Sequence, residues 1–206
     1  MSIDTHWFST LFGWYTFSGM WISGTIVVTL FVLFLKSKGY LEQVNDSHIH
    51  DLGKWMFAIS FLWSYLWFSQ FMLIWYANIP EEVTYYLNRI ENFQWAFFGM
   101  FIVNLAFPMI MLMSRDSKRN FGFLFFVGIL IFLGHWVDTY IMIMPGSLAN
   151  AAGGEPFVWG GFALYEIAMM LGFLGLFLFV VQVALTKAPL MVKSHPYLGE
   201  TIHHHV

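Results

Sequence analysis

A histidine and an aspartate lie close together inside a stretch of otherwise apolar residues. His135 and Asp138 are three positions apart between 121 and 144, and this spacing puts two side chains on the same face of a helix. A carboxyl group in a medium of low dielectric resists ionisation, and a neighbouring imidazole can exchange a proton with it. The pair therefore predicts either a proton relay or a polar contact that holds helices together.

Three further polar residues in apolar stretches complete the set of proton-path candidates. If the helix that carries Glu166 begins where its apolar stretch begins, the carboxyl of Glu166 reaches about the depth of Asp138. For Gln70, a hydrogen bond between helices is the simpler interpretation. Asn104 lies four residues before Pro108, which has no N–H to bond the Asn104 carbonyl. The sequence therefore predicts a helix kink there, with water binding at Asn104 as the alternative.

The apolar stretches that carry these residues are long enough to cross a membrane. Hydrophobic residues make up 59% of the chain and charged residues 10%, whereas a soluble domain carries about 25% charged residues. Crossing the hydrocarbon core takes about 20 helical residues, and the stretches lack the alternation of a membrane β-strand. We predict an all-α integral membrane protein with a bundle of five transmembrane helices. The expected spans lie near 11–35, 55–77, 93–113, 121–144 and 157–185.

Lysine and arginine residues predict how this domain is oriented. Of the nine in the chain, only Arg89 falls in a loop on one side, and the others fall on the opposite side. Because basic loops stay in the cytoplasm, we expect a periplasmic N-terminus, a transmembrane domain over 1–190 and a cytoplasmic tail over 191–206. Tryptophan and tyrosine residues near the span ends, such as Trp14 and Tyr15, are typical of the aromatic belts of membrane proteins.

The composition excludes several kinds of cofactor and partner. The chain has no cysteine, so it cannot hold an iron–sulfur cluster, a thioether-linked haem or a disulfide by itself. A membrane-embedded b-type haem normally needs two histidines from facing helices, and His135 is the one histidine well inside a predicted span. We expect no metal site. Nine Lys and Arg against twelve Asp and Glu argue against nucleic-acid binding.

Four strings along the chain resemble a known family. They are HWFSTLFGWYTFSGMWISG (6–24), FLWSYLWFSQFMLIWYANIPEE (61–82), GHWVDTYIMIMP (134–145) and SHPYLGETIHHH (194–205). Together they are similar to the polysulfide-reductase-like (NrfD-type) membrane subunits. More narrowly, they resemble the C-terminal half of the second such subunit of bacterial alternative complex III. Subunits of this family contain ten transmembrane helices, so the five predicted spans correspond to about half of one.

The resemblance implies a membrane subunit of a quinol:cytochrome c oxidoreductase, or of one with another electron acceptor, in the bacterial inner membrane. The implied partners are a paralogous membrane subunit, an iron–sulfur subunit and c-type cytochrome subunits, and these partners would carry the haems and iron–sulfur clusters. Quinol binding by this chain stays open, with the paralogous subunit as the better candidate. His135, Asp138 and Glu166 lie where the resemblance puts a proton path.

Two alternatives to a proton-transferring subunit follow from the residues alone. A purely structural membrane anchor would dock the redox subunits through the periplasmic loops expected at 78–92 and 145–156. An independent transporter would have an inverted repeat and a binding site near the middle of the membrane. The sequence shows no internal symmetry of that kind.

A reporter protein fused after Val206 tests the predicted orientation. We expect green fluorescent protein to fluoresce at this position and alkaline phosphatase to be inactive, because the tail is predicted to be cytoplasmic. Phosphatase inserted at 145–156 serves as the control and should be active. The opposite pattern of phosphatase activity would reverse the topology.

Overall fold

The computed structural model describes residues 2–4, 7–153, 157–191 and 195–204, and every regular element within these ranges is helical. The elements are α1 (Leu11–Ser37), α2 (Asp46–Ala77), α3 (Pro80–Asn92), α4 (Gln94–Phe101), the π-helical turn η1 (Ile102–Ala106), α5 (Phe107–Met111), α6 (Arg115–Arg119), α7 (Phe121–Ala152), α8 (Leu164–Lys187) and α9 (Leu198–Ile202). Five helical stretches are long and apolar enough to cross a membrane: α1, α2, the α4–η1–α5 segment, α7 and α8. The prediction of an all-helical membrane protein with five spans is confirmed.

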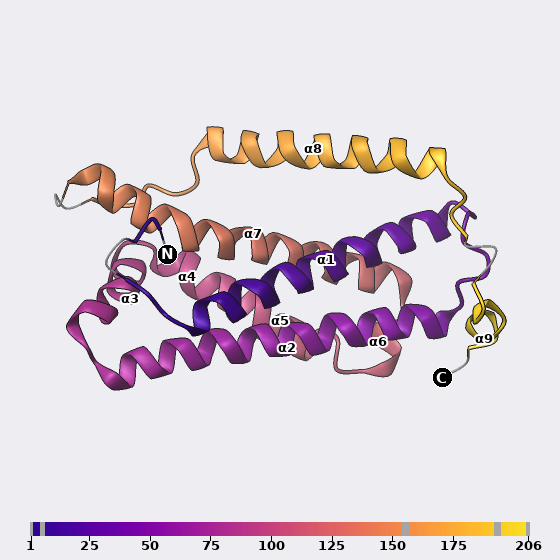
Figure 1. Cartoon of the computed structure of the whole chain (residues 1–206), viewed down its shortest axis with the longest axis horizontal. Coiled ribbons are helices and arrows are strands. Elements are labelled where there is room, and N and C mark those ends of the chain that lie inside the picture. Colours follow the sequence, from indigo (N-terminus) through magenta and orange to yellow (C-terminus); the bar gives the residue numbers. More distant parts are fainter. Residues whose placement is uncertain (1, 5–6, 154–156, 192–194, 205–206) are drawn as a thin grey trace.

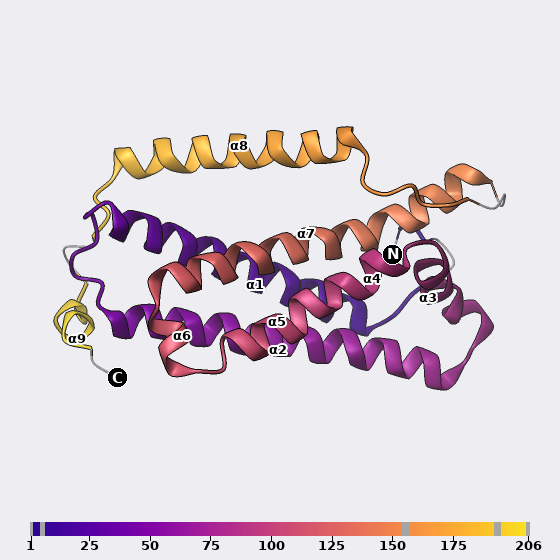
Figure 2. The same ribbon diagram turned by 180° about the vertical axis from the view of Figure 1, so that it is seen from behind.

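Four of the spans pack around a shared interior, and the fifth lies beside them. α1 contacts α2 and α7, and the α4–η1–α5 segment contacts both α2 and α7. In Figures 1 and 2, α8 runs along the outside of these helices, and none of its residues is buried. The described residues therefore form a four-span bundle, with α8 as an exposed apolar helix next to it.

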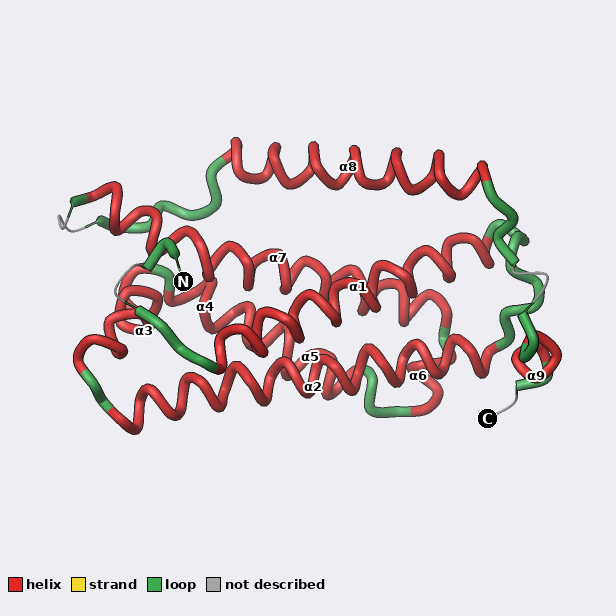
Figure 3. Tube along the Cα trace, viewed as in Figure 1, coloured by secondary structure: helices red, strands yellow, loops and turns green. Residues whose placement is uncertain are grey.

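The connections between helices gather at two ends of the molecule (Figure 3). The N-terminal end holds residues 2–4, α3 and the connection from α7 to α8, whereas the basic end holds α6, α9 and the connection from α1 to α2 (Figure 1). Apart from Arg89, the described lysines and arginines lie in α6, in the connection from α1 to α2, or in the parts of α1, α2 and α8 nearest the basic end. The fold therefore separates the loops as the charge pattern predicts. Which end faces the cytoplasm stays a prediction.

The second span begins earlier than its hydrophobicity indicates. α2 starts at Asp46 rather than near 55, because the Asn45 side chain caps it by accepting the backbone N–H groups of Ser47 and His48. A cap of this kind satisfies N–H groups that have no partner within the helix. The polar residues that follow the cap are therefore the first turns of a long helix rather than a loop.

The fourth and fifth spans also differ from the predicted boundaries. α7 continues through Pro145 and ends at Ala152, where Gly153 adopts a φ of 60°. The predicted loop at this position is therefore largely helical, and its residues 154–156 lie outside the described ranges. α8 begins at Leu164, several residues later than predicted. Glu166 consequently lies in the first turn of α8 and not deep within the span.

The third span contains the π-helical turn η1 at the position where a kink was predicted. The Phe107 N–H bonds to the Ile102 carbonyl, which is five residues back and defines a π turn. Pro108 has no N–H, so the Asn104 carbonyl lacks its usual helical donor. The wider turn carries the Asn104 side chain, which is fully buried.

Buried side chains form two clusters along the bundle. The aromatic cluster lies toward the N-terminal end and consists of Trp7, Tyr15, Trp63, Trp67, Ile74, Tyr85, Tyr86, Phe93, Ala96, Phe97, Met100, Tyr140 and Ile141. The aliphatic cluster lies toward the basic end and consists of Ile22, Ile26, Leu33, Ile49, Met56, Ile59, Leu112, Leu124, Val127 and Ile131. Along α7 the aliphatic cluster ends at Ile131 and the aromatic cluster begins at Tyr140. His135 and Asp138 therefore lie where the two clusters meet.

Gly134 of α7 allows η1 to pack closely, and replacing it should weaken the bundle. A Cβ atom at Gly134 would lie 2.1 Å from Oδ1 of Asn104. We expect Gly134→Ala to lower the free energy of unfolding by about 1–3 kcal/mol, the usual cost of overpacking, measured by thermal or SDS-induced unfolding in detergent. Gly24→Ala in α1 is the control, because a Cβ there meets nothing within 4 Å. Equal stability of the two variants would contradict the close packing.

Candidate functional site

Asp138 is the polar centre of the bundle interior, and its carboxyl group joins three spans. The residue is only 1% exposed. The Tyr15 hydroxyl of α1 donates a hydrogen bond to Oδ1, and Nε1 of Trp63 in α2 donates one to Oδ2 at 3.2 Å. A buried carboxyl needs donors of this kind, because burying it without hydrogen bonds is costly. The contacts explain how α7 can carry an acidic side chain among apolar neighbours.

His135 lies beside Asp138, as their spacing predicts. Its Nδ1 is 3.8 Å from Oδ2 of Asp138, which is too long for a direct hydrogen bond. The indole ring of Trp63 stands edge-on to the imidazole, with the ring centroids 5.1 Å apart. Neither ring nitrogen of this buried histidine has a hydrogen-bond partner among the described residues. Buried nitrogens without partners are rare and indicate bound water or a functional role.

The two neutral candidates also lie in the interior. The Asn104 side chain packs against Gly134, the residue before His135, and neither atom of its amide is hydrogen-bonded within the described part of the chain. Gln70 of α2 is 3% exposed, and it lines the same small cavity as Tyr86. The structure therefore brings Asn104 next to the His135 segment and buries Gln70 toward the N-terminal end.

Glu166 does not join this group. The Tyr140 hydroxyl lies 3.1 Å from both of its carboxylate oxygens, and the Ala163 N–H donates to Oε2 at 2.8 Å. Tyr140 follows Asp138 by two residues, so the two side chains leave α7 on different faces. Between the residues that the structure describes, no hydrogen bond or ion pair links Glu166 to His135 or Asp138. Glu166 caps α8 and attaches its first turn to α7.

A small cavity lies beside this site on the side of the N-terminal end. Its volume is about 10 Å³, close to the space that one water molecule needs. The lining residues are Tyr15, Trp67, Gln70, Tyr85, Tyr86, Arg89, Phe97, Met100, Ile141 and Met142. Because Tyr15 both lines the cavity and bonds to Asp138, the cavity and the buried carboxyl share a polar group.

The two tyrosines of α3 in this cavity keep their hydroxyl protons at neutral pH. Burial raises the pKa of Tyr85 to about 12, although the nearby Arg89 cation opposes the rise. Burial likewise raises the pKa of Tyr86 well above its ordinary value. Both phenols can therefore donate as well as accept hydrogen bonds within the cavity.

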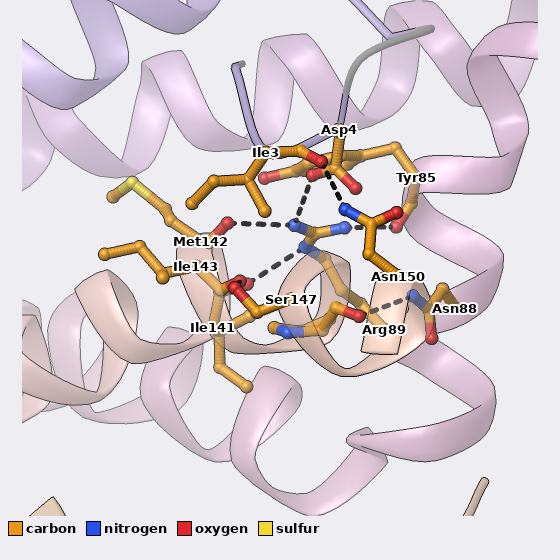
Figure 4. A network of polar contacts seen from close by, with 11 residues as sticks. Ile3, Asp4, Tyr85, Asn88, Arg89, Ile141, Met142, Ile143, Ser147 and Asn150 are labelled. Atoms are coloured by element: carbon orange, nitrogen blue, oxygen red, sulfur yellow. Dashed lines mark hydrogen bonds and ion pairs between the residues drawn. The ribbon is translucent and has the colours of Figure 1, made fainter. Parts of the chain in front are cut away.

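Arg89 also lines the cavity, and Figure 4 shows the network of polar contacts around it. The residue is 1% exposed. Its Nε donates to the Ile141 carbonyl at 3.0 Å, and its Nη2 donates to the Met142 carbonyl at 3.1 Å and to the Asp4 carboxylate at 3.3 Å. The guanidinium carbon lies 3.3 Å from the centre of the Tyr85 ring. The sequence placed Arg89 in a loop, whereas the structure shows a buried and multiply bonded cation in helix α3.

Pro145 explains why a cation is bound at this point. Proline has no N–H, so the Ile141 carbonyl four residues earlier has no helical donor, and Arg89 supplies one. The side-chain amide of Asn88 donates to the carbonyl of Pro145 itself at 3.2 Å. The carbonyl four residues before a helical proline can be located from the sequence alone. Ile141 stands in this position before Pro145, as Asn104 does before Pro108.

The N-terminal segment covers the Arg89 network. Besides the ion pair of Asp4 with Arg89, the Asn150 side chain donates to the Ile3 carbonyl at 2.8 Å. A Cβ at Gly146 would lie 2.6 Å from Oδ1 of Asp4, so glycine is needed for this approach. Residues near the start of the chain are thereby fixed to the last turns of α7.

Tyr15 and Trp63 are site residues that sequence analysis missed. Tyr15 was interpreted as part of an aromatic belt, yet it is buried, whereas its neighbour Trp14 is exposed. Trp63 lies seven residues before Gln70 in α2, so it shares a helix face with a residue already singled out. This spacing in the sequence could have indicated that Trp63 faces the bundle interior together with Gln70.

The assembled site can hold and exchange protons. It places a carboxyl, an imidazole and a phenol together inside an apolar bundle, and all three are groups that accept or donate protons in proteins. Comparison of the chain with models of known protein families and with curated protein sequences gave no match. The functional argument therefore depends on the geometry of the site.

A pair of substitutions tests the link between Arg89 and Pro145. We expect Arg89→Met to lower the free energy of unfolding by about 1–3 kcal/mol, because the change leaves the buried Ile141 and Met142 carbonyls without this donor. Pro145→Ala returns an N–H that can bond the Ile141 carbonyl, so adding it to Arg89→Met should recover about 1 kcal/mol. A double-mutant cycle of unfolding midpoints measures this coupling.

Pro108→Ala is the matched control for this cycle, because Pro108 lies in α5 and the hydrogen bonds of Arg89 go to α3, α7 and Asp4 instead. Its effect should simply add to that of Arg89→Met. If Pro145→Ala behaved in the same additive way, Arg89 would not be compensating for the proline.

Proposed function

We propose that this chain is a membrane subunit of a respiratory quinol:cytochrome c oxidoreductase, or of one with another electron acceptor, and that Asp138 and His135 transfer protons within it. The observation that carries the proposal is the buried Asp138 carboxyl, bonded to Tyr15 and Trp63 with the His135 imidazole beside it. Ionisable side chains inside membrane helices are costly, and they usually mark proton relays or ion pathways.

The composition supports the proposal that partner subunits in a bacterial inner membrane carry the redox cofactors. Since the chain has no cysteine, iron–sulfur clusters would belong to an iron–sulfur subunit and covalently attached haems to c-type cytochrome subunits. Quinol oxidation releases protons, and these must reach water from a site within the membrane. The paralogous membrane subunit would bind the quinol, and the Asp138 site would accept the protons.

The exposed α8 supports the proposal of a partner within the membrane. None of its residues is buried, and its aromatic and aliphatic side chains are exposed along the whole helix. Small residues at Ala168 and Gly172 form a ridge that allows another helix to approach closely. The helices of the paralogous subunit would pack on this surface.

The bonds made by Asp138 also favour a second function. Both of its oxygens accept hydrogen bonds from neighbouring spans, and a purely structural contact between helices requires nothing more. The chain would then be an anchor that docks the redox subunits through α3 and the connection from α7 to α8.

Asp138→Asn in the intact complex distinguishes the two functions. Asparagine has nearly the same shape but cannot release a proton, so a proton-transferring Asp138 predicts a loss of turnover of about 10²-fold. The measurements are quinol oxidation as a function of pH and proton release reported by an indicator dye. Unchanged turnover and proton release would remove Asp138 from the mechanism.

Trp63→Phe is the control for Asp138→Asn. It removes the hydrogen bond to Oδ2 of Asp138 but keeps the carboxyl group that can bind a proton. We expect Trp63→Phe to lower stability and to retain most of the turnover. A loss of turnover as large as that of Asp138→Asn would favour the anchor.

A further inference from the structure

We propose that a water molecule binds in the cavity between Gln70, Tyr86 and Arg89, and that through this water Asp138 exchanges protons only with the N-terminal end of the bundle. The exchange of protons depends on the proposed function. The water site does not depend on it, because it is argued from the lining of the cavity alone.

The cavity has the size and the polar groups that one water requires. Its volume is about 10 Å³, and a bound water needs at least two polar partners. Oε1 of Gln70 is buried and accepts no hydrogen bond from any described residue. Tyr15, Tyr85 and Tyr86 line the same cavity. A water here would donate to Oε1 of Gln70 and bond to a phenol, which satisfies an atom that is otherwise costly to bury.

The cavity connects the buried carboxyl to the surface of the N-terminal end. Tyr15 bonds to Asp138 on one side of the cavity, and Arg89 borders it on the other. Arg89 in turn pairs with Asp4, whose side chain is 21% exposed. With a water beside Tyr15, a proton can pass from Asp138 to the phenol oxygen while the phenol proton passes to the water. Arg89 cannot release its own proton, so the transferred proton leaves when this water exchanges with solvent past the Arg89–Asp4 pair.

The opposite direction is closed by the aliphatic cluster. Its members are at most 3% exposed and carry no polar side-chain atoms. The buried hydroxyl in this half of α1, that of Thr29, donates to the Thr25 carbonyl of its own helix. His50 lies beyond the cluster, near the start of α2. Beyond the buried polar side chains of His135, Asn104 and Ser60, layers of apolar side chains from this cluster separate Asp138 from the basic end.

Hydroxyl-radical footprinting by synchrotron radiolysis tests the water site, because radicals formed from a bound water oxidise the side chains around it. Met100 lines the cavity and is 3% exposed, whereas Met56 lies in the aliphatic cluster and is 0% exposed. Both are buried thioethers, which oxidise to sulfoxides. In the intact complex, we expect Met100 to be oxidised several-fold faster than Met56. Equal, slow oxidation would overturn the water site, and fast oxidation of Met56 would overturn the one-sided access.

Two variants complete the experiment. Gln70→Leu replaces the amide by an apolar group of similar size, and it should reduce Met100 oxidation to the rate of Met56. Asp138→Asn leaves the lining of the cavity intact, so Met100 should still be oxidised. If Met100 is oxidised but Asp138→Asn keeps full turnover, the water site stands and the proposed function fails. If turnover falls but Met100 is protected, the water site alone is wrong.

Discussion

A carboxyl group cannot lie inside an apolar bundle without hydrogen-bond donors, and this requirement determines how three spans meet. Asp138 takes one donor from α1 and another from α2. Leaving a buried polar group without its hydrogen-bond partner costs about 1–3 kcal/mol, so sliding or rotating either helix is opposed. Gly19 of α1 faces Trp63 and Asp138, and its lack of a side chain leaves room for both. The packing of the bundle and the geometry of the site are therefore the same set of contacts.

Two prolines inside spans create a second demand, and the fold meets it in two ways. Pro108 is accommodated by the π-helical turn that carries Asn104. Pro145 leaves the α-helical course of α7 intact, and the freed carbonyl is bonded by Arg89 instead. A side chain can act as a donor in this way only near the end of a span, where the chain of α3 crosses over α7. In both cases a missing backbone N–H brings polar groups into an apolar region, and these groups border the Asp138 site.

The sequence predicted features that depend on a single helix, such as its length and the spacing of its polar residues. It missed contacts that depend on how several helices pack. Span length and composition predicted five helices, and the spacing of His135 and Asp138 predicted their contact. The partners Tyr15 and Trp63 depend on the crossing and register of α1 and α2, which the periodicity of one helix does not contain. Glu166 was placed too deep because its depth depends on where α8 begins, and the apolar residues before Leu164 hide that start. Membrane orientation depends on charged loops alone and stays a prediction.

The position of Asp138 between the two clusters gives the site a direction. Tyrosine and tryptophan are large enough to fill a core and still carry an O–H or N–H, whereas isoleucine, leucine and valine offer no such group. The half of the bundle that is rich in tyrosine and tryptophan can therefore bond a carboxyl and a water. The half built from isoleucine, leucine and valine cannot. Beyond His135, Asn104 and Ser60, the neighbours of Asp138 toward the basic end are apolar, whereas polar groups continue toward the N-terminal end. This asymmetry follows from amino-acid types along α1, α2 and α7, and it favours release of protons on one side over their passage through the bundle.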